Sequence, residues 1–143
     1  MILKIPLQIV IMDGDGCHIF IHGRLNSKEA NLLVDTGASK TIFDLKRIEK
    51  FVGKKKKSFE IFGSNSTGLG TTSLESHFTI VDEFCISDLI FKDYQAILLD
   101  MKHVNRSYKM LGLPPIDGVF GSDMLYHYKA VIDYDQEIMK LKI

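Results

Sequence analysis

The sequence predicts an all-β domain whose strands close or fold over on themselves, with one to three short helices. Apolar residues alternate with polar ones over several short stretches, which is the period of a half-buried strand. Turn-forming residues separate these stretches, and helical spacing is confined to short segments. Because strands do not alternate with long helices, we expect a barrel or folded sheet and not a parallel α/β fold. The 143 residues fit one domain, 1–143, with its own core.

Four strands are predicted in the N-terminal third of the chain. In order, they are residues 5–11, residues 17–22, the strand that ends at Asp35, and residues 41–43. In the second strand, Ile19 and Ile21 point to one face and Phe20 points to the other. Asp44 is then expected to cap a short helix that runs to about residue 52.

The remaining strands are expected to form hairpins. They are residues 58–62 and 73–80 around a glycine-rich segment, residues 84–86 and 89–99 around a turn at 87–88, and residues 129–134 and 137–143 at the C-terminus. Two more short helices are predicted between them. Val104, Tyr108 and Leu111 have helical spacing in the first, which ends at Gly112, and Ser122 is expected to cap the second.

The composition excludes several classes of partner. The chain is 45% hydrophobic, 25% charged and carries no net charge, so we expect no binding of nucleic acid or of a membrane surface through overall charge. No stretch approaches the roughly 18 apolar residues that a membrane span needs. The N-terminus lacks a basic lead-in and a cleavage site of small residues. If the sequence is full length, we expect a cytoplasmic protein; a removed signal peptide stays open as the alternative.

Neither the cysteines nor the histidines indicate a metal site. Cys17 and Cys85 are too few for a disulfide framework, so we expect reduced, buried thiols, with one disulfide as the alternative. His18 and His22 point the same way along a strand, but no cysteine or carboxylate completes a ligand set. We therefore predict neither a metal nor a cofactor. The run 54–57 of four lysines is interpreted as a solvated loop, with a basic patch as the alternative.

The most informative segment surrounds Asp35. An apolar strand leads directly into this carboxylate, and four small residues follow it: Thr36, Gly37, Ala38 and Ser39. A carboxylate at the end of a buried strand is costly unless the protein uses it. Gly37 allows a sharp turn, and Thr36 supplies a hydroxyl that can brace the loop. This combination is typical of a site at which a carboxyl group activates water.

The segment Asp35-Thr36-Gly37-Ala38-Ser39 resembles the active-site loop of aspartic proteases. A second segment, residues 117–125, resembles the second signature of that family, in which two apolar residues and a glycine precede a short helix. The chain holds one Asp-Thr-Gly, so it resembles the single-lobe, retropepsin-like branch, which builds its site from two copies of one chain. The resemblance implies a closed acid-protease barrel with Asp35 as the catalytic residue. It implies supporting roles for Thr36, Gly37, Ala38, Ser39, Val119, Phe120 and Gly121.

The activity implied by this resemblance is that of an aspartic endopeptidase acting on a peptide or protein substrate. Peptide hydrolysis needs both a base and an acid, and in aspartic proteases two carboxyls about 3 Å apart share one proton for this purpose. The partner carboxyl would be Asp35 of a second chain in a twofold homodimer. Ser122 replaces an arginine that is usual in viral members, so their arginine-based dimer contact does not carry over. Asp117 and Asp123 are interpreted as capping residues.

The glycine-rich segment about thirty residues after Asp35 resembles the flap that folds over bound peptide in this family. The flap residues would be Phe62, Gly63, Ser64, Asn65, Gly68, Leu69 and Gly70; the alternative is a plain flexible loop. Apolar side chains would line the substrate site, and we expect Phe62, Leu69, Val119 and Phe120 among them.

Two other functions compete with the endopeptidase. The first is a non-catalytic module of the same fold that holds an extended peptide through strand-like bonds. The second is a general β-barrel in which the Asp-Thr-Gly motif occurs by chance. The presence of an intact Asp-Thr-Gly favours the endopeptidase, because a peptide-binding module has no need of a close carboxylate pair.

Overall fold

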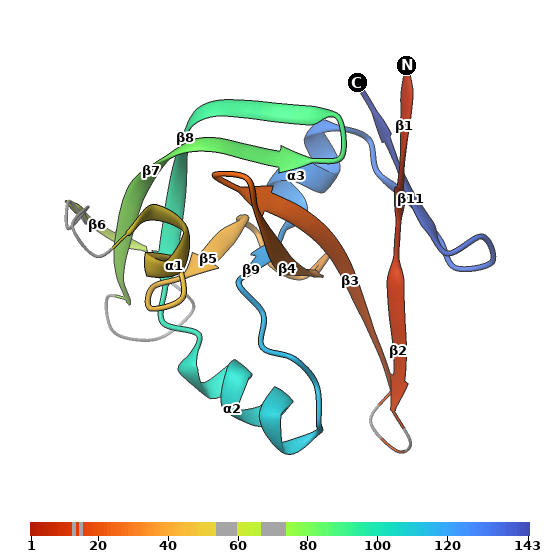
Figure 1. The fold of residues 1–143 in the computed structure, drawn as a ribbon, viewed down its shortest axis with the longest axis horizontal. Helices are drawn as coiled ribbons and strands as arrows, with labels where there is room; N and C mark the ends of the chain where they lie inside the picture. Colours follow the sequence, from red (N-terminus) through yellow and green to blue (C-terminus); the bar gives the residue numbers. More distant parts are fainter. Residues whose placement is uncertain (13, 15, 54–59, 67–73) are drawn as a thin grey trace.

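The computed structural model of the chain describes residues 1–12, 14, 16–53, 60–66 and 74–143 (Figure 1). The strands are β1 (Ile2–Pro6), β2 (Gln8–Met12), β3 (Gly16–Leu25), β4 (Lys28–Val34), β5 (Ile42–Asp44), β6 (Glu60–Ser66), β7 (Leu74–Ile86), β8 (Leu89–Leu99), β9 (Gly118–Phe120), β10 (Val131–Asp133) and β11 (Ile138–Lys142). The helices are α1 (Glu49–Val52), α2 (Lys102–Met110) and α3 (Ser122–His127). The predicted all-β class with short helices is confirmed. None of these helices has the length and apolar character that crossing a membrane requires.

Six strands close into a barrel. Their order is β3-β4-β9-β5-β8-β7, and β7 pairs back onto β3 through Arg24↔Cys85 and Leu25↔Phe84. β2 extends the sheet beyond β3, and β6 extends it beyond β7. β4 and β9 pair in parallel, whereas β3 and β4 pair antiparallel. Closure confirms the predicted barrel and removes the exposed edges that an open sheet of these strands would leave.

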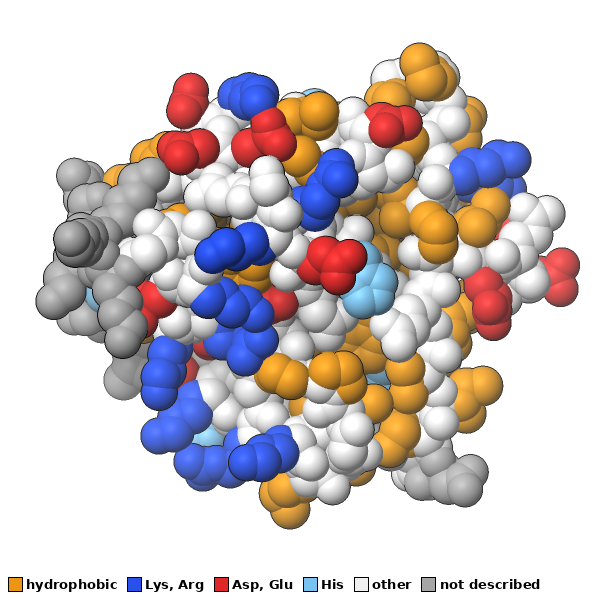
Figure 2. Space-filling view, viewed as in Figure 1, with side chains coloured by type: hydrophobic (Ala, Val, Ile, Leu, Met, Phe, Trp, Pro, Cys, Tyr) orange, Lys and Arg blue, Asp and Glu red, His pale blue; other side chains and the backbone are white. Residues whose placement is uncertain are grey.

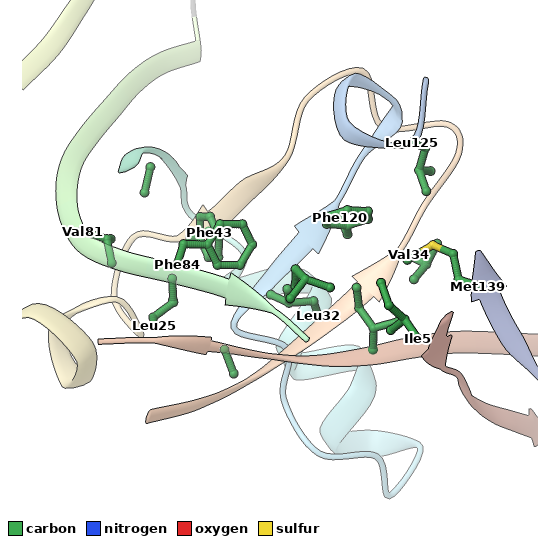
Figure 3. Close-up of a cluster of buried hydrophobic side chains, with 14 of the residues drawn as sticks. Ile5, Leu25, Leu32, Val34, Phe43, Val81, Phe84, Phe120, Leu125 and Met139 are labelled. Carbon is green, nitrogen blue, oxygen red and sulfur yellow. The ribbon is translucent and has the colours of Figure 1, made fainter. Parts of the chain in front are cut away.

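The barrel interior holds the main hydrophobic core (Figure 3). Leu32, Phe43, Phe84 and Phe120 are fully buried there, and the rings of Phe43 and Phe84 meet edge to face with centroids 5.4 Å apart. Burying one such side chain contributes roughly 1.5–3 kcal/mol. Val34 also packs in this core. Since side chains alternate along a strand, the intervening residues of β4 face the outside of the barrel.

The two ends of the chain form a separate three-stranded sheet in the order β1-β11-β10. The backbone N–H of Ile143 donates to the carbonyl of Met1 at 3.0 Å, and both termini lie at one end of this sheet (Figure 1). The predicted strand 5–11 is therefore divided at Leu7, whose N–H donates to the carbonyl of Glu137 at 2.9 Å. The chain leaves β11 at this point and pairs with β3 as β2. The alternation of apolar residues continues across the break, so it did not reveal the change of partner.

Asp44 has a wider role than the predicted cap. It lies in β5, and its Oδ2 accepts a hydrogen bond from the N–H of Arg47 at 2.8 Å in the turn that precedes α1. Its Oδ1 accepts from the N–H of Met101 at 2.8 Å, just before α2 begins. One buried carboxylate thus holds the starts of two helical segments. The helix predicted over 44–52 is shorter than expected, because α1 begins only at Glu49.

Asp117 joins β4 and β9 to the α1 segment through its buried carboxylate. Oδ2 accepts from the N–H of Asn31 at 2.8 Å, and Oδ1 lies 2.8 Å from both Arg47 Nε and Lys50 Nζ. The backbone N–H of Asp117 also donates to the Asn31 carbonyl at 2.8 Å. These contacts give Asp117 a structural role at the start of β9, in place of simple capping.

The prediction that both cysteines are reduced and buried is confirmed for Cys85, whereas Cys17 is not buried. Cys85 is buried and Cys17 is exposed, and both are free thiols. Burial raises the pKa of the Cys85 thiol, which makes it a weak nucleophile near neutral pH. Cys17 sits near the end of the β2–β3 hairpin, where the strand has left the core.

Basic side chains gather on the side of the molecule where α1 and α2 lie (Figure 2). In α2, Lys102, Arg106 and Lys109 are exposed and follow one another at spacings of four and three, so they share one face of the helix. The lysine run 54–57 lies outside the described residues, and its interpretation as a solvated loop stays a prediction.

Candidate active site

Asp35 directly follows β4, where that strand lies between β3 and β9. Leu32, Leu33 and Val34 pair in parallel with Gly118, Val119 and Phe120. The N–H of Asp35 donates to the carbonyl of Phe120 at 3.1 Å, which extends this pairing by one residue. Alternation along the strand places Asp35 on the same face as Leu33, outside the barrel core. The half-buried Asp35 side chain is therefore carried by a rigid strand end.

The loop after Asp35 turns tightly around its carboxylate. The N–H of Gly37 donates to Asp35 Oδ1 at 2.8 Å, and the N–H of Ala38 donates to the Asp35 carbonyl at 3.2 Å. A Cβ atom added at Gly37 would lie 3.2 Å from Asp35 Oδ1. Thr36 and Ser39 are exposed, as is Gly37, and Ala38 is half-buried. The five predicted residues thus form one continuous turn whose backbone orients the carboxylate.

The beginning of α3 holds this loop from the other side. The N–H of Ser122 donates to the carbonyl of Ala38 at 2.7 Å, and Ser122 Oγ donates to the carbonyl of Thr36 at 2.5 Å. A Cβ atom added at Gly121 would lie 2.5 Å from the carbonyl oxygen of Lys40. The predicted cap at Ser122 is wrong: Gly121 occupies the N-cap position, and Ser122 is the first helical residue. Its hydroxyl is bonded to the loop instead of to the helix.

Thr41 and Asp123 form a second, partly buried connection that sequence reasoning missed. Thr41 Oγ1 accepts from the N–H of Gly121 at 3.0 Å and donates to Asp123 Oδ1 at 2.8 Å. The same carboxylate oxygen accepts from the N–H of Thr41 at 2.9 Å and from that of Met124 at 2.8 Å. Asp123 therefore joins the loop to α3 in addition to bonding within the helix. The signal available in the sequence was the hydroxyl residue Thr41 at the start of the predicted strand 41–43.

Val119 and Phe120 point to opposite sides of the barrel wall. Phe120 is fully buried in the main core, so the expectation that it lines a substrate pocket is wrong. Val119 belongs to a second buried cluster on the outer side, where half-buried Ala38 packs against it. Phe120 contacts the loop through its carbonyl bond to Asp35, and Val119 belongs to the cluster against which Ala38 packs.

The predicted hairpin is present as a pair of strands. β6 pairs antiparallel with β7 from Glu60↔Phe78 to Ser66↔Leu74, with an irregularity in register between Phe62 and Ser66. Phe62, Gly63, Ser64 and Asn65 lie within β6. Gly68, Leu69 and Gly70 lie outside the described residues. The role of this hairpin as a flap stays a prediction.

The other chemically notable places do not adjoin the loop. Among the described residues, no three side chains of His, Cys, Asp or Glu gather in a way that could hold a metal ion. A cavity of about 340 Å³ is lined by β3, β4 and the turn between β7 and β8, including Arg24 and Cys85. None of residues 35–39 lines it.

We expect the substitution Thr41→Val to lower the free energy of unfolding by about 2 kcal/mol, because it leaves the buried N–H of Gly121 without an acceptor and removes a donor to Asp123. Urea denaturation measures this loss. Thr79 offers a matched control, since its side chain is fully buried and its Oγ1 has no hydrogen-bond partner in the described structure. Thr79→Val should keep or raise the stability. Equal losses in the two variants would contradict the role given to Thr41.

Comparisons with known proteins agree with this geometry. A retropepsin-like aspartic protease from Rickettsia conorii superposes with a TM-score of 0.57 at 20% identity, covering 99% of this chain and 90% of that one. The retroviral protease-like domain of Ddi1 from Leishmania major superposes with a TM-score of 0.54 at 12% identity, covering 85% and 86% respectively. At these identities the similarity shows the fold. No curated protein matches the chain significantly.

The match to a family model shows the family as well as the fold. The family model described as aspartyl protease matches residues 21–124, which is more than half of the chain and includes both the Asp35 loop and the segment 119–121. The chain therefore belongs to the aspartyl protease family and has the retropepsin-like fold.

Proposed function

We propose that the chain is an aspartic endopeptidase whose active site is formed by Asp35 from each of two chains in a homodimer. The observation that carries this proposal is the placement of Asp35 at the end of β4, with backbone bonds of 3.1 Å to Phe120 and 2.8 Å from Gly37. The structural carboxylates Asp44 and Asp117 are buried with partners on both oxygens, whereas Asp35 is half-buried beside an exposed turn. This arrangement supports a role in chemistry.

Two copies of Asp35 would divide the work of hydrolysis. When two carboxyls lie close together they share one proton, as is established for aspartic proteases in general. The ionised carboxyl accepts a proton from water as the water oxygen attacks the peptide carbonyl carbon, and the protonated carboxyl donates to the carbonyl oxygen. Proton transfer to the nitrogen then allows the C–N bond to break. Two such carboxyls titrate as a coupled pair, so an apparent pKa describes the pair and not one residue.

The terminal sheet supports pairing of two chains. In the described part of the chain, β1 and β10 are the outer strands of this sheet. Large hydrophobic side chains are exposed on or beside it: Met1, Ile2, Val131, Tyr134 and Ile143. Exposed apolar residues at outer strands favour association. Within one chain the two termini already pair with each other, so we propose that the dimer adds contacts at the outer strands.

The proposed substrate is an extended stretch of a peptide or protein. Such a stretch would lie across the Asp35 loop, with the hairpin of β6 and β7 closing over it as a flap. Closure would exclude water from the carboxylate pair and align the peptide backbone.

We expect Asp35→Asn to lower peptide cleavage by at least about 100-fold, since the amide can neither accept the proton of water nor share one with its partner. Cleavage of an unbiased peptide library, followed by mass spectrometry across pH, provides the measurement. Asp88→Asn at an exposed turn is the control and should cut like the unmodified chain. Cleavage that survives Asp35→Asn in pure, folded protein would refute the proposal.

The substitution Ala38→Ser is expected to move the acidic limb of the pH–rate profile to lower pH. A serine hydroxyl there could donate to the carboxylate pair and favour its charged form, which alanine cannot do. The profile of kcat/KM against pH on one cleaved peptide measures the effect. Ser39→Ala, on the exposed side of the loop, should leave the limb in place. An unmoved limb in Ala38→Ser would count against this account of the loop.

A further inference from the structure

The outer face of the barrel next to Asp35 carries an unusual row of apolar side chains. The row consists of Phe20, Leu33, Val119 and Ile42, one each from β3, β4, β9 and β5. Register pairs each with the next: Phe20↔Leu33, Leu33↔Val119 and Val119↔Ile42. Leu33 lies on β4 two residues before Asp35, which directly follows the strand, so the two share a face. The row thus adjoins the carboxylate on the side away from the main core.

Helix α2 covers one part of this row through Tyr108. Tyr108 is only 6% exposed, and its ring meets that of Phe20 edge to face with centroids 5.9 Å apart. Its hydroxyl lies 3.4 Å from His18 Nδ1. Phe20 and Val119 are buried together with Tyr108 in the second cluster. The ring of Tyr108 therefore occupies the space above the row at the Phe20 side.

Two residues of the row, on either side of buried Val119, are more accessible. Leu33 and Ile42 are half-buried, as is Ala38 of the Asp35 loop, and all three pack against the second cluster. Figure 2 shows hydrophobic side chains at the surface between α2 and the hairpin of β2 and β3. An apolar strip that begins beside a catalytic carboxylate offers a place to bury a substrate side chain next to the bond that is cut.

Asn105 and Tyr108 both attach α2 to the rest of the chain. Within the helix Tyr108 is the buried residue, whereas Val104 is 39% exposed. Asn105 Nδ2 donates to the carbonyl of Ile116 at 3.1 Å, and its Oδ1 accepts from the N–H of Ile116 at 2.8 Å. The amide of Asn105 fixes the helix, and the ring of Tyr108 fills the space between the helix and the row.

We propose that Tyr108 is a specificity-determining residue that forms the end wall of a substrate side-chain site on this row. This inference rests on the proposed endopeptidase function and adds a size limit to it. A short apolar side chain fits on Leu33, Ala38 and Ile42, whereas a long aromatic one meets the ring of Tyr108. Removing that ring extends the site to Phe20 and enlarges the side chain that is accepted.

The test uses one cleaved peptide in which the residue on either side of the cut is varied among Ala, Val and Phe. Tyr108→Ala should raise the ratio of kcat/KM for Phe over Ala by at least about tenfold. Tyr108→Phe keeps the ring and loses only the hydroxyl beside His18, so it should keep the original preference. Val104→Ala, on the exposed side of the same helix, should also keep the original preference.

A second variant keeps the test valid if Tyr108→Ala does not fold, which circular dichroism and thermal unfolding will show. Leu113 is half-buried against the same cluster, and Leu113→Ala should shift the preference in the same direction by a smaller factor. An unchanged preference in the folded variants would overturn the inference.

Binding separates this inference from the proposed function. The same peptides are titrated against Asp35→Asn chains with and without Tyr108→Ala. If Tyr108→Ala improves binding of the Phe peptide relative to the Ala peptide, while chains that retain Asp35 cut neither peptide, the endopeptidase proposal fails and the size limit stands. If the chains cut in an Asp35-dependent way but the preference does not move, the size limit fails alone. Absence of binding to every chain would overturn the size limit as well.

Discussion

The parallel pairing of β4 with β9 is the constraint on which the position of Asp35 depends. On its other side, β9 is held close to β5 and to the Asp35 loop by two glycines, at positions where a side chain would not fit. A Cβ atom at Gly118 would lie 2.5 Å from the carbonyl oxygen of Ile42, and one at Gly121 would lie 2.5 Å from that of Lys40. Such separations are far below van der Waals contact, so β9 and the following turn can approach β5 and the Asp35 loop only through glycine. The position of the Asp35 carboxylate depends on this close approach.

Four aspartates surround this junction, and their environments give them different roles. Asp44 and Asp117 are buried, and backbone N–H groups or cations occupy both of their oxygens. Asp123 gathers three N–H or O–H donors on one oxygen. Burying Asp44 and Asp117 without such partners would cost several kcal/mol, and the donors on half-buried Asp123 join it to Thr41 and α3, so we assign these three to structure. Asp35 is half-buried at an exposed turn, as the proposed contact with a substrate and a second chain requires.

Much of the fold followed from the sequence because periodicity reports which face of a strand is buried. The strand leading to Asp35 and a barrel or folded sheet were predicted in this way, whereas the closed acid-protease barrel and the role of the segment 119–121 came from the resemblance to aspartic proteases. Periodicity does not report pairing partners, so the division of strand 5–11 at Leu7 was missed. The Thr41–Asp123 bond was also missed, since it joins residues 82 positions apart. The cover that α2 places over Phe20 depends on packing between elements, which the helical spacing of Tyr108 did not disclose.

The central claim is that two chains contribute one Asp35 each to a single site, and mixing of subunits tests it most directly. Unmodified chains and a tagged Asp35→Asn variant are combined in varied ratios at constant total concentration, and capture through the tag verifies that mixed dimers form. If both carboxyls are required, an equal mixture retains about one quarter of the activity of the unmodified sample, because only dimers with two intact copies cut. Retention of about one half, falling linearly with the fraction of unmodified chains, would contradict the account.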